Sequence, residues 1–160
     1  MAANVGRTQS KWVDFQVDDS AGTLRSIPVA TINGVGVTYD EQELLALQDQ
    51  LHNALPNFAN APIDITGPFD TTAAAASPAL SGSHTVLSAI NGLSVPLSLA
   101  VKVGVRHAWD AEPIFGLTAS ATSGYLCVSY TVDVSNGTYA ARFVPYPGSS
   151  VPAWGTSAIT

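Results

Sequence analysis

The feature that most constrains this fold is a strict alternation of side chains late in the chain. Apolar side chains occupy every even position of residues 126–134, and small or polar side chains occupy the odd positions. A period of two is typical of a β-strand with one buried face. Asn136-Gly137 follows directly, and this pair favours a two-residue type I′ turn in which both residues have positive φ. The sequence therefore predicts a hairpin whose second strand runs through residues 139–143.

The same alternation predicts further strands near residues 12–17, 24–31, 63–65, 99–105 and 115–121. One segment differs, because leucines between Thr38 and Leu55 recur at spacings of three and four, as on one face of an amphipathic helix. Thr38 and Glu41 fit a capping box, and Pro56 would end the helix. The predicted fold is mainly β with one α-helix: two packed antiparallel sheets, as a β-sandwich or barrel, flanked by a helix at about residues 39–55.

Charged residues are scarce. They make up 11% of the chain, whereas an ordinary soluble domain carries about 25%. A compact monomer of 16.5 kDa exposes roughly 7,500 Å², which leaves about one charge per 400 Å². The many Ser, Thr, Asn and Gln residues are able to solvate such a surface, but burial against other subunits explains the deficit more directly. Self-assembly is therefore the first functional expectation.

The net charge of −6 and the scattered Lys and Arg residues argue against a nucleic-acid-binding patch. No apolar run approaches the length of about 18 residues that a membrane span requires, and the first residues lack the apolar core of a signal peptide. We expect a non-secreted chain without a membrane partner. The single cysteine, Cys127, has no partner for an internal disulfide and is interpreted as a small buried hydrophobe.

Candidate catalytic groups are few. His107, Asp110 and Glu112 lie close in sequence, but on an extended chain only Asp110 and Glu112 share a face, so one metal ion would require a turn between them and His107. Ser83 and His84 are adjacent and lack a third orienting group. The sequence therefore predicts no enzyme, no catalytic or metal-binding residue, no cofactor and no small-molecule substrate.

Two segments lack self-sufficient structure. Residues 71–83 are small, uncharged and without a period, so they form either a flexible surface loop or an arm that orders against a neighbouring subunit. Residues 148–160 are expected to form a C-terminal arm whose tryptophan docks on its own domain or on a partner. The candidates for contact between subunits are Thr71, Pro78, Leu80, Ser83 and Trp154.

Several stretches follow one another in an order that covers most of the chain. They are GRT at residues 6–8, TYDE at 38–41, APIDITGPFD at 61–70, SHTVL at 83–87, the strand at 125–130 and PAWG at 152–155. Together they resemble the major tail tube proteins of long, non-contractile-tailed bacteriophages. The same ring fold is also known from contractile tails and related injection machines.

The resemblance implies that residues 1–160 form one tail-tube-like domain and that six copies form a ring. Stacked rings would make a hollow tube that conducts DNA into the host. The implied partners are other copies, other tail proteins at the tube ends and DNA in passage, in a virion tail assembled in the bacterial cytoplasm. An acidic or neutral lumen repels phosphates, so DNA slides without sticking. The candidates for lumen-facing residues are Ser129, Thr131 and Asp133.

Two other readings stay open. A tail terminator or a capsid-decorating subunit shares the same composition, but would stop at one ring or trimer, whereas a tube protein stacks. A carbohydrate-binding β-sandwich would explain Trp12, Trp109 and the tyrosines, and it predicts an exposed aromatic platform.

Overall fold

The computed structural model describes residues 13–43, 46, 54–76, 79–104, 113–156 and 159, and this part of the chain is mostly β. Its elements are β1 (Val13–Asp18), β2 (Leu24–Ser26), β3 (Thr31–Asn33), β4 (Thr38–Glu43), β5 (Ala54–Asn60), β6 (Ile63–Pro68), α1 (Ser83–Ile90), β7 (Leu99–Val103), β8 (Ile114–Leu117), β9 (Tyr125–Asp133), β10 (Thr138–Pro145) and β11 (Ala153–Gly155). None of the described residues belongs to a helix long and apolar enough to cross a membrane. The predicted mainly β fold with one helix is confirmed.

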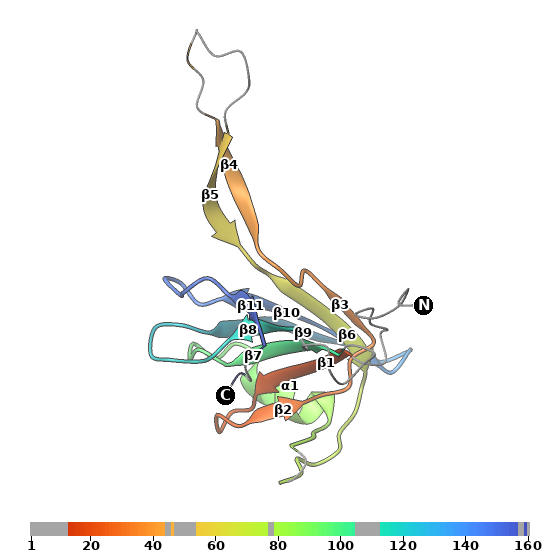
Figure 1. The fold of residues 1–160 in the computed structure, drawn as a ribbon. Coiled ribbons are helices and arrows are strands. Elements are labelled where there is room, and N and C mark those ends of the chain that lie inside the picture. The colour runs from red at the N-terminus through yellow and green to blue at the C-terminus, as the bar shows by residue number, and fades with distance from the viewer. Residues whose placement is uncertain are drawn as a thin grey trace, which may run out of the picture.

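Two antiparallel sheets form the body of the molecule (Figure 1). One has the strand order β11-β8-β7-β1-β2, and the other has the order β3-β6-β10-β9. Phe15 of β1 lies opposite Val101 of β7, and both are buried. The ring of Phe15 lies 5.6 Å from the ring of Phe143 on β10, measured between centroids. The two sheets therefore share one core, as the alternation predicted.

Helix α1 closes one side of this core. Leu87 and Ile90 on its inner face are fully buried among the core residues. Its first residue, Ser83, donates a hydrogen bond from Oγ to the carbonyl oxygen of Pro68 at 2.8 Å. The same Oγ accepts one from the backbone N–H of Asp70 at 3.1 Å. Ser83 thus fastens the start of the helix to the end of β6.

The helix predicted at about residues 39–55 is wrong, because β4 and β5 pair as a two-stranded antiparallel hairpin. Residues 44–45 and 47–53 lie outside the described part. β5 leads almost directly into β6, the strand of the body drawn in yellow in Figure 1, so the extended backbone of a body strand continues into the hairpin. Cross-strand pairing therefore outweighs the leucine spacing. Pro56 fits in β5 because this strand pairs with β4 alone among the described strands, and an edge strand can lack one N–H.

The connection from β9 to β10 is a four-residue loop, residues 134–137, and not the predicted type I′ turn. Gly137 has a φ of +64°, but no described non-glycine residue has positive φ, so Asn136 lacks the conformation that turn requires. Asp133 organises the loop instead. Its Oδ2 accepts a hydrogen bond from Asn136 Nδ2 at 2.7 Å, and its Oδ1 accepts from the backbone N–H groups of Ser135 and Asn136 at 3.1 and 3.3 Å. The bond from the Asn136 side chain is the main reason that the pKa of Asp133 is lowered.

A β-bulge in β9 exchanges the two faces of this strand. The residues opposite Arg142 and Phe143 of β10 are Ser129 and Cys127, which leaves Val128 as an extra residue. Before the bulge the odd positions face the core, and after it the even positions do. Val128 is consequently half-exposed, although the alternation placed it on the buried face.

Truncation of the aromatic contact between the sheets tests this core. Phe143 is completely buried, so Phe143→Ala is expected to lower the free energy of unfolding by about 3–5 kcal/mol because it leaves a cavity. Val134→Ala is the control, since that side chain is 88% exposed, and it is expected to change stability by less than about 0.5 kcal/mol. Urea denaturation measures both. Equal effects of the two substitutions would contradict a core shared by the sheets.

The loop makes a prediction for pH. Because hydrogen bonds lower the pKa of Asp133 in the folded state, its carboxylate stabilises the fold above its ordinary pKa of 3.8, and this contribution is lost as the pH falls through the folded-state pKa. An NMR titration of the Asp133 carboxyl carbon should give a midpoint below 3.8. Asn136→Ala should move the midpoint back toward that value, and Asn33→Ala should not. A wild-type midpoint at or above 3.8 would overturn this account.

Candidate assembly surfaces

The hairpin β4–β5 extends away from the two-sheet body (Figure 1). Every residue of both strands is exposed, and among the described strands the two pair only with each other. Tyr39 and Leu55 are half-exposed and Phe58 is 73% exposed. Since an isolated two-stranded ribbon is only marginally stable in water, this hairpin is a surface that a partner would stabilise.

The pairing register places two of these apolar side chains on one face. Leu55 lies opposite Gln42, and Ala59 lies opposite Tyr39. Phe58 therefore shares the face of Leu55 and is directed away from that of Tyr39. The leucine spacing concealed this hairpin in the sequence. The contrary signals were the β-forming pair at residues 38–39 and the proline and asparagines at 56, 57 and 60, which are poor helix formers.

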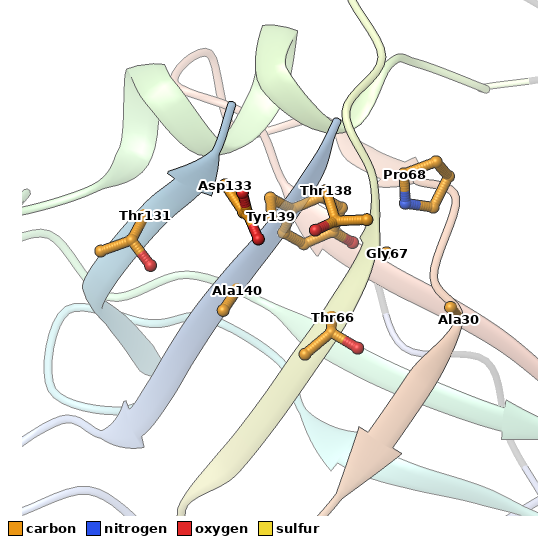
Figure 2. Close-up of a pocket in the computed structure, with 9 residues that line it drawn as sticks. All are labelled: Ala30, Thr66, Gly67, Pro68, Thr131, Asp133, Thr138, Tyr139 and Ala140. Carbon is orange, nitrogen blue, oxygen red and sulfur yellow. The ribbon is translucent and has the colours of Figure 1, made fainter. Parts of the chain in front are cut away.

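The outward face of the four-stranded sheet is made of small polar side chains. Thr131 and Asp133 of β9 lie on it beside Thr138 and Ala140 of β10 (Figure 2). Ser129, which follows the bulge, belongs to the same face. The structure thus brings the three residues predicted to face a lumen together, although it does not test that role. A shallow hollow of about 610 Å³ lies here, lined by Ala30, Thr66, Gly67, Pro68, Thr131, Asp133, Thr138, Tyr139 and Ala140.

This face carries little net charge. Its charged side chains in the four strands are Asp64, Asp133 and Arg142. Arg142 Nη1 donates to both carboxylate oxygens of Asp64, at 2.9 and 3.1 Å. Asp133 is engaged within its own loop. Within the described strands, every cation on this face therefore already has a carboxylate partner. A phosphate group that met this face would find no unpaired cation there.

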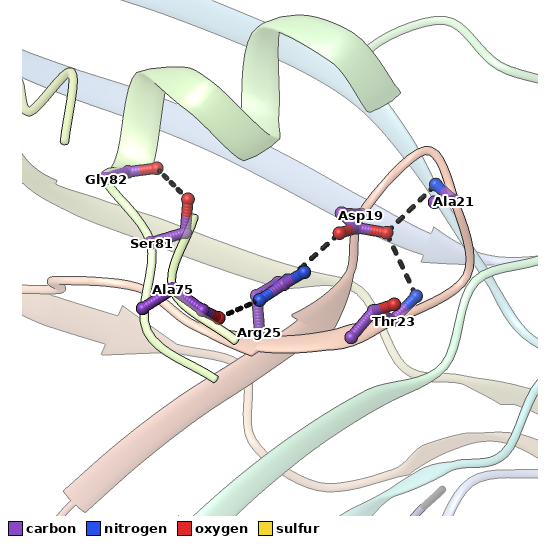
Figure 3. A network of polar contacts seen from close by, with 7 residues as sticks. All are labelled: Asp19, Ala21, Thr23, Arg25, Ala75, Ser81 and Gly82. Atoms are coloured by element: carbon purple, nitrogen blue, oxygen red, sulfur yellow. Dashed lines mark hydrogen bonds and ion pairs between the residues drawn. The ribbon is translucent and has the colours of Figure 1, made fainter. Parts of the chain in front are cut away.

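Part of the segment 71–83 is attached to the neighbouring strand β2 (Figure 3). Arg25 of β2 donates one hydrogen bond from Nη1 to the carbonyl oxygen of Ala75. From Nε it donates another, at 3.0 Å, to Oδ2 of Asp19. Asp19 in turn accepts backbone N–H groups of its own turn. Arg25 therefore links the β1–β2 turn to the segment.

The contact candidates of this segment differ in accessibility. Leu80 is half-exposed and forms a parallel bridge with Ser26. Thr71 is exposed, Pro78 lies outside the described residues, and Ser83 is completely buried. Contact between this segment and a second subunit stays a prediction. Ser83 itself cannot take part in such a contact, because its side chain is buried within its own chain.

Trp154 lies on β11, the edge strand that pairs with β8. Its ring lies 5.2 Å from the ring of Phe115, measured between centroids, and 51% of Trp154 is exposed. Trp154 thus docks on its own domain, one of the two outcomes the sequence allowed. Half of its surface stays accessible to a partner, and that contact is still a prediction.

The candidate catalytic groups do not converge in the described part of the chain. His107, Asp110 and Glu112 lie outside the described residues. His84 Nδ1 lies 2.9 Å from Oη of Tyr130, so His84 is not paired with Ser83. Burial raises the pKa of the Cys127 thiol to about 11, which leaves it a poor nucleophile. No three His, Cys, Asp or Glu residues among those described are grouped to hold a metal ion.

No protein-family model and no curated protein matches the sequence. Two solved structures of an extracellular contractile injection system resemble nearly the whole chain. A chain in the cryo-EM structure of the PVC sheath/tube terminator in the extended state is 11% identical, with a TM-score of 0.54 over 93% of this chain and 96% of that one. A chain of the PVC sheath-tube complex in the extended state is 10% identical, with a TM-score of 0.53 over 94% and 93%. The protein therefore has a fold found in these assemblies, which confirms the predicted tail-tube-like fold.

Proposed function

We propose that this chain is a structural subunit of a tail tube and has no catalytic role. Its copies form rings, six to a ring as the sequence resemblance implies, and the rings stack around a lumen that conducts DNA. The observation that carries this proposal is the similarity of the fold, over nearly the whole chain, to chains of sheath and tube assemblies. Those assemblies are contractile, whereas the sequence resemblance is to tubes of non-contractile tails, so we propose the subunit for a tail of either kind.

The exposed surface supports assembly. Tyr39, Leu55, Phe58 and Trp154 each expose about half of their surface or more. Contact with neighbouring copies would cover these apolar side chains.

The sheet edges supply places where neighbours can join. Among the described strands, β2, β3, β9 and β11 each have a strand on one side only. The bridges from Ser26 to Leu80 and from Leu97 to Tyr125 cover part of β2 and the start of β9. The other edges expose backbone groups that pair readily with another chain. An edge that binds a different edge of the next copy gives a head-to-tail contact, and such contacts form a ring when the rotation from copy to copy closes.

The outward face of the four-stranded sheet suits the lumen. It is rich in threonine and its one arginine is neutralised by Asp64. Phosphate groups of DNA passing over the described strands would meet one cation, Arg142, which is already paired with Asp64, so passage would be rapid. We assign Ser129, Thr131 and Asp133 to the lumen on this basis.

A tube terminator is the second candidate, because one of the two similar structures contains a sheath/tube terminator. Electron microscopy of the purified chain separates the two. A tube subunit should give stacked rings with open centres, whereas a terminator should stop at single rings. A chain that stays monomeric at high concentration, also when short pre-formed tubes are added as seeds, would contradict both.

The hairpin tests assembly more specifically. Leu55→Ser with Phe58→Ser should leave the fold intact, because both side chains are exposed and lie outside the core. Loss of two apolar contacts should raise the concentration required for assembly about tenfold or more. Val134→Ser is the matched control on another exposed loop. Sedimentation and electron microscopy measure the effect, and unchanged assembly of the hairpin variant would exclude this face from the interface.

A further inference from the structure

The charges of this chain are distributed unevenly. No Lys or Arg occurs between Arg25 and Lys102. Within that interval β4 carries Asp40, Glu41 and Glu43, all exposed, and its partner strand β5 carries no charged residue. The hairpin that projects from the body is therefore acidic along one strand and apolar along the other.

The basic residues of the body are already engaged. Arg25 is paired with Asp19, and Arg142 is paired with Asp64. Lys102 also has an interaction within the described part of the chain. Glu43 already has an interaction. For Asp40 and Glu41, a basic complement from this sequence would come from the remaining three basic residues, which are Arg7, Lys11 and Arg106.

Of these three, Arg106 lies between Lys102 on one side and Asp110 and Glu112 on the other, so the charges of residues 102–112 cancel. Residues 1–12 differ, because they contain Arg7 and Lys11 and no acidic residue. Lys102 and Arg106 also have no acid between them, but Lys102 belongs to β7 and already has an interaction there, so only residues 1–12 add two further basic residues. Its charge is opposite to that of β4.

We propose that β4 of one copy is the docking site for residues 1–12 of a second copy. The inference rests on the proposed self-assembly, and it names the segment that meets the hairpin. Each copy then gives one basic segment and receives another on its acidic strand. Such a head-to-tail contact repeats through an assembly. Single exposed ion pairs are weak, so repetition is what makes the contact effective.

The position of the hairpin favours a second copy over the same chain. Residues 1–12 join the body at Val13, which lies beside Ile32 in a small cleft between the sheets. The hairpin extends away from that body (Figure 1), and its strands pair with no other described strand. A neighbour that reaches the hairpin from outside also covers its apolar side chains, Leu55 and Phe58.

Charge reversal on both sides tests the proposal. One variant carries Asp40→Lys and Glu41→Lys, and the other carries Arg7→Glu and Lys11→Glu. Each variant alone should require about tenfold more protein to assemble, because like charges then face each other. A mixture of the two should assemble as the wild type does, since each hairpin then meets an oppositely charged segment of the other variant. Circular dichroism checks that every variant is folded.

The outcomes separate the possibilities. Assembly of either variant alone at the wild-type concentration would overturn the proposal. So would a mixture that stays unassembled while a chain with all four substitutions assembles, because the segment would then bind its own hairpin. Failure of the wild type itself to assemble would count against the proposed function and not against the contact, which a second measurement tests separately.

That measurement uses a synthetic peptide of residues 1–12 and the folded chain carrying Arg7→Glu and Lys11→Glu. NMR titration should show binding at β4 that weakens as salt is added. Asp40→Asn with Glu41→Gln in the same chain should weaken binding about tenfold. A peptide with both basic residues replaced by glutamate is the control. No shift at β4, or equal binding of the control peptide, would overturn the proposal.

Discussion

The contact between Phe15 and Phe143 is the interaction on which the rest of the structure depends. It joins β1 and β10, each an inner strand of its sheet, so the two sheets are fixed to each other through strands that are themselves paired on both sides. Helix α1, the edges of both sheets and the base of the hairpin are all positioned by this core. The described core is formed by side chains of one chain. What a partner can add is limited to the edges, the sheet faces and the hairpin.

The extra residue at Val128 determines which side chains the four-stranded sheet presents outward. Without it, an uninterrupted alternation would direct Tyr125 and Cys127 to the same side as Ser129 and Thr131, and polar side chains would be buried or aromatic ones exposed. With it, the start of β9 buries Tyr125 and Cys127, and the rest of the strand exposes a polar face. A bulge at an edge strand thus reconciles a continuous core with a smooth polar surface.

The sequence predicted the strands that bury one face, such as β1, β7, β9 and β10. Burial of one face requires apolar and polar residues to alternate, and this alternation is visible in the sequence. The prediction of secondary structure failed for strands that do not pack against the core. In β4 and β5 every residue is exposed, so the leucine spacing did not correspond to a buried face. The structure of this segment is decided by pairing between the two strands. Helix α1 escaped notice because it spans eight residues, several of them β-branched. Of the candidate site, the polar residues of β9 followed from alternation, whereas the exposure of Phe58 depends on the hairpin and has no local signal.

The hairpin and the body obey different physical requirements. The body buries Phe15, Phe115, Tyr125 and Phe143 in its own interior. The hairpin exposes Leu55 and Phe58, and its described strands pair with no strand but each other, which in water leaves a ribbon of marginal stability. A chain with so few charges tolerates this exposure at a cost in solubility as a monomer. Exposure of these apolar side chains is unfavourable in a monomer. In the proposed assembly the hairpin would be buried, and the same side chains would then contribute to the association of copies.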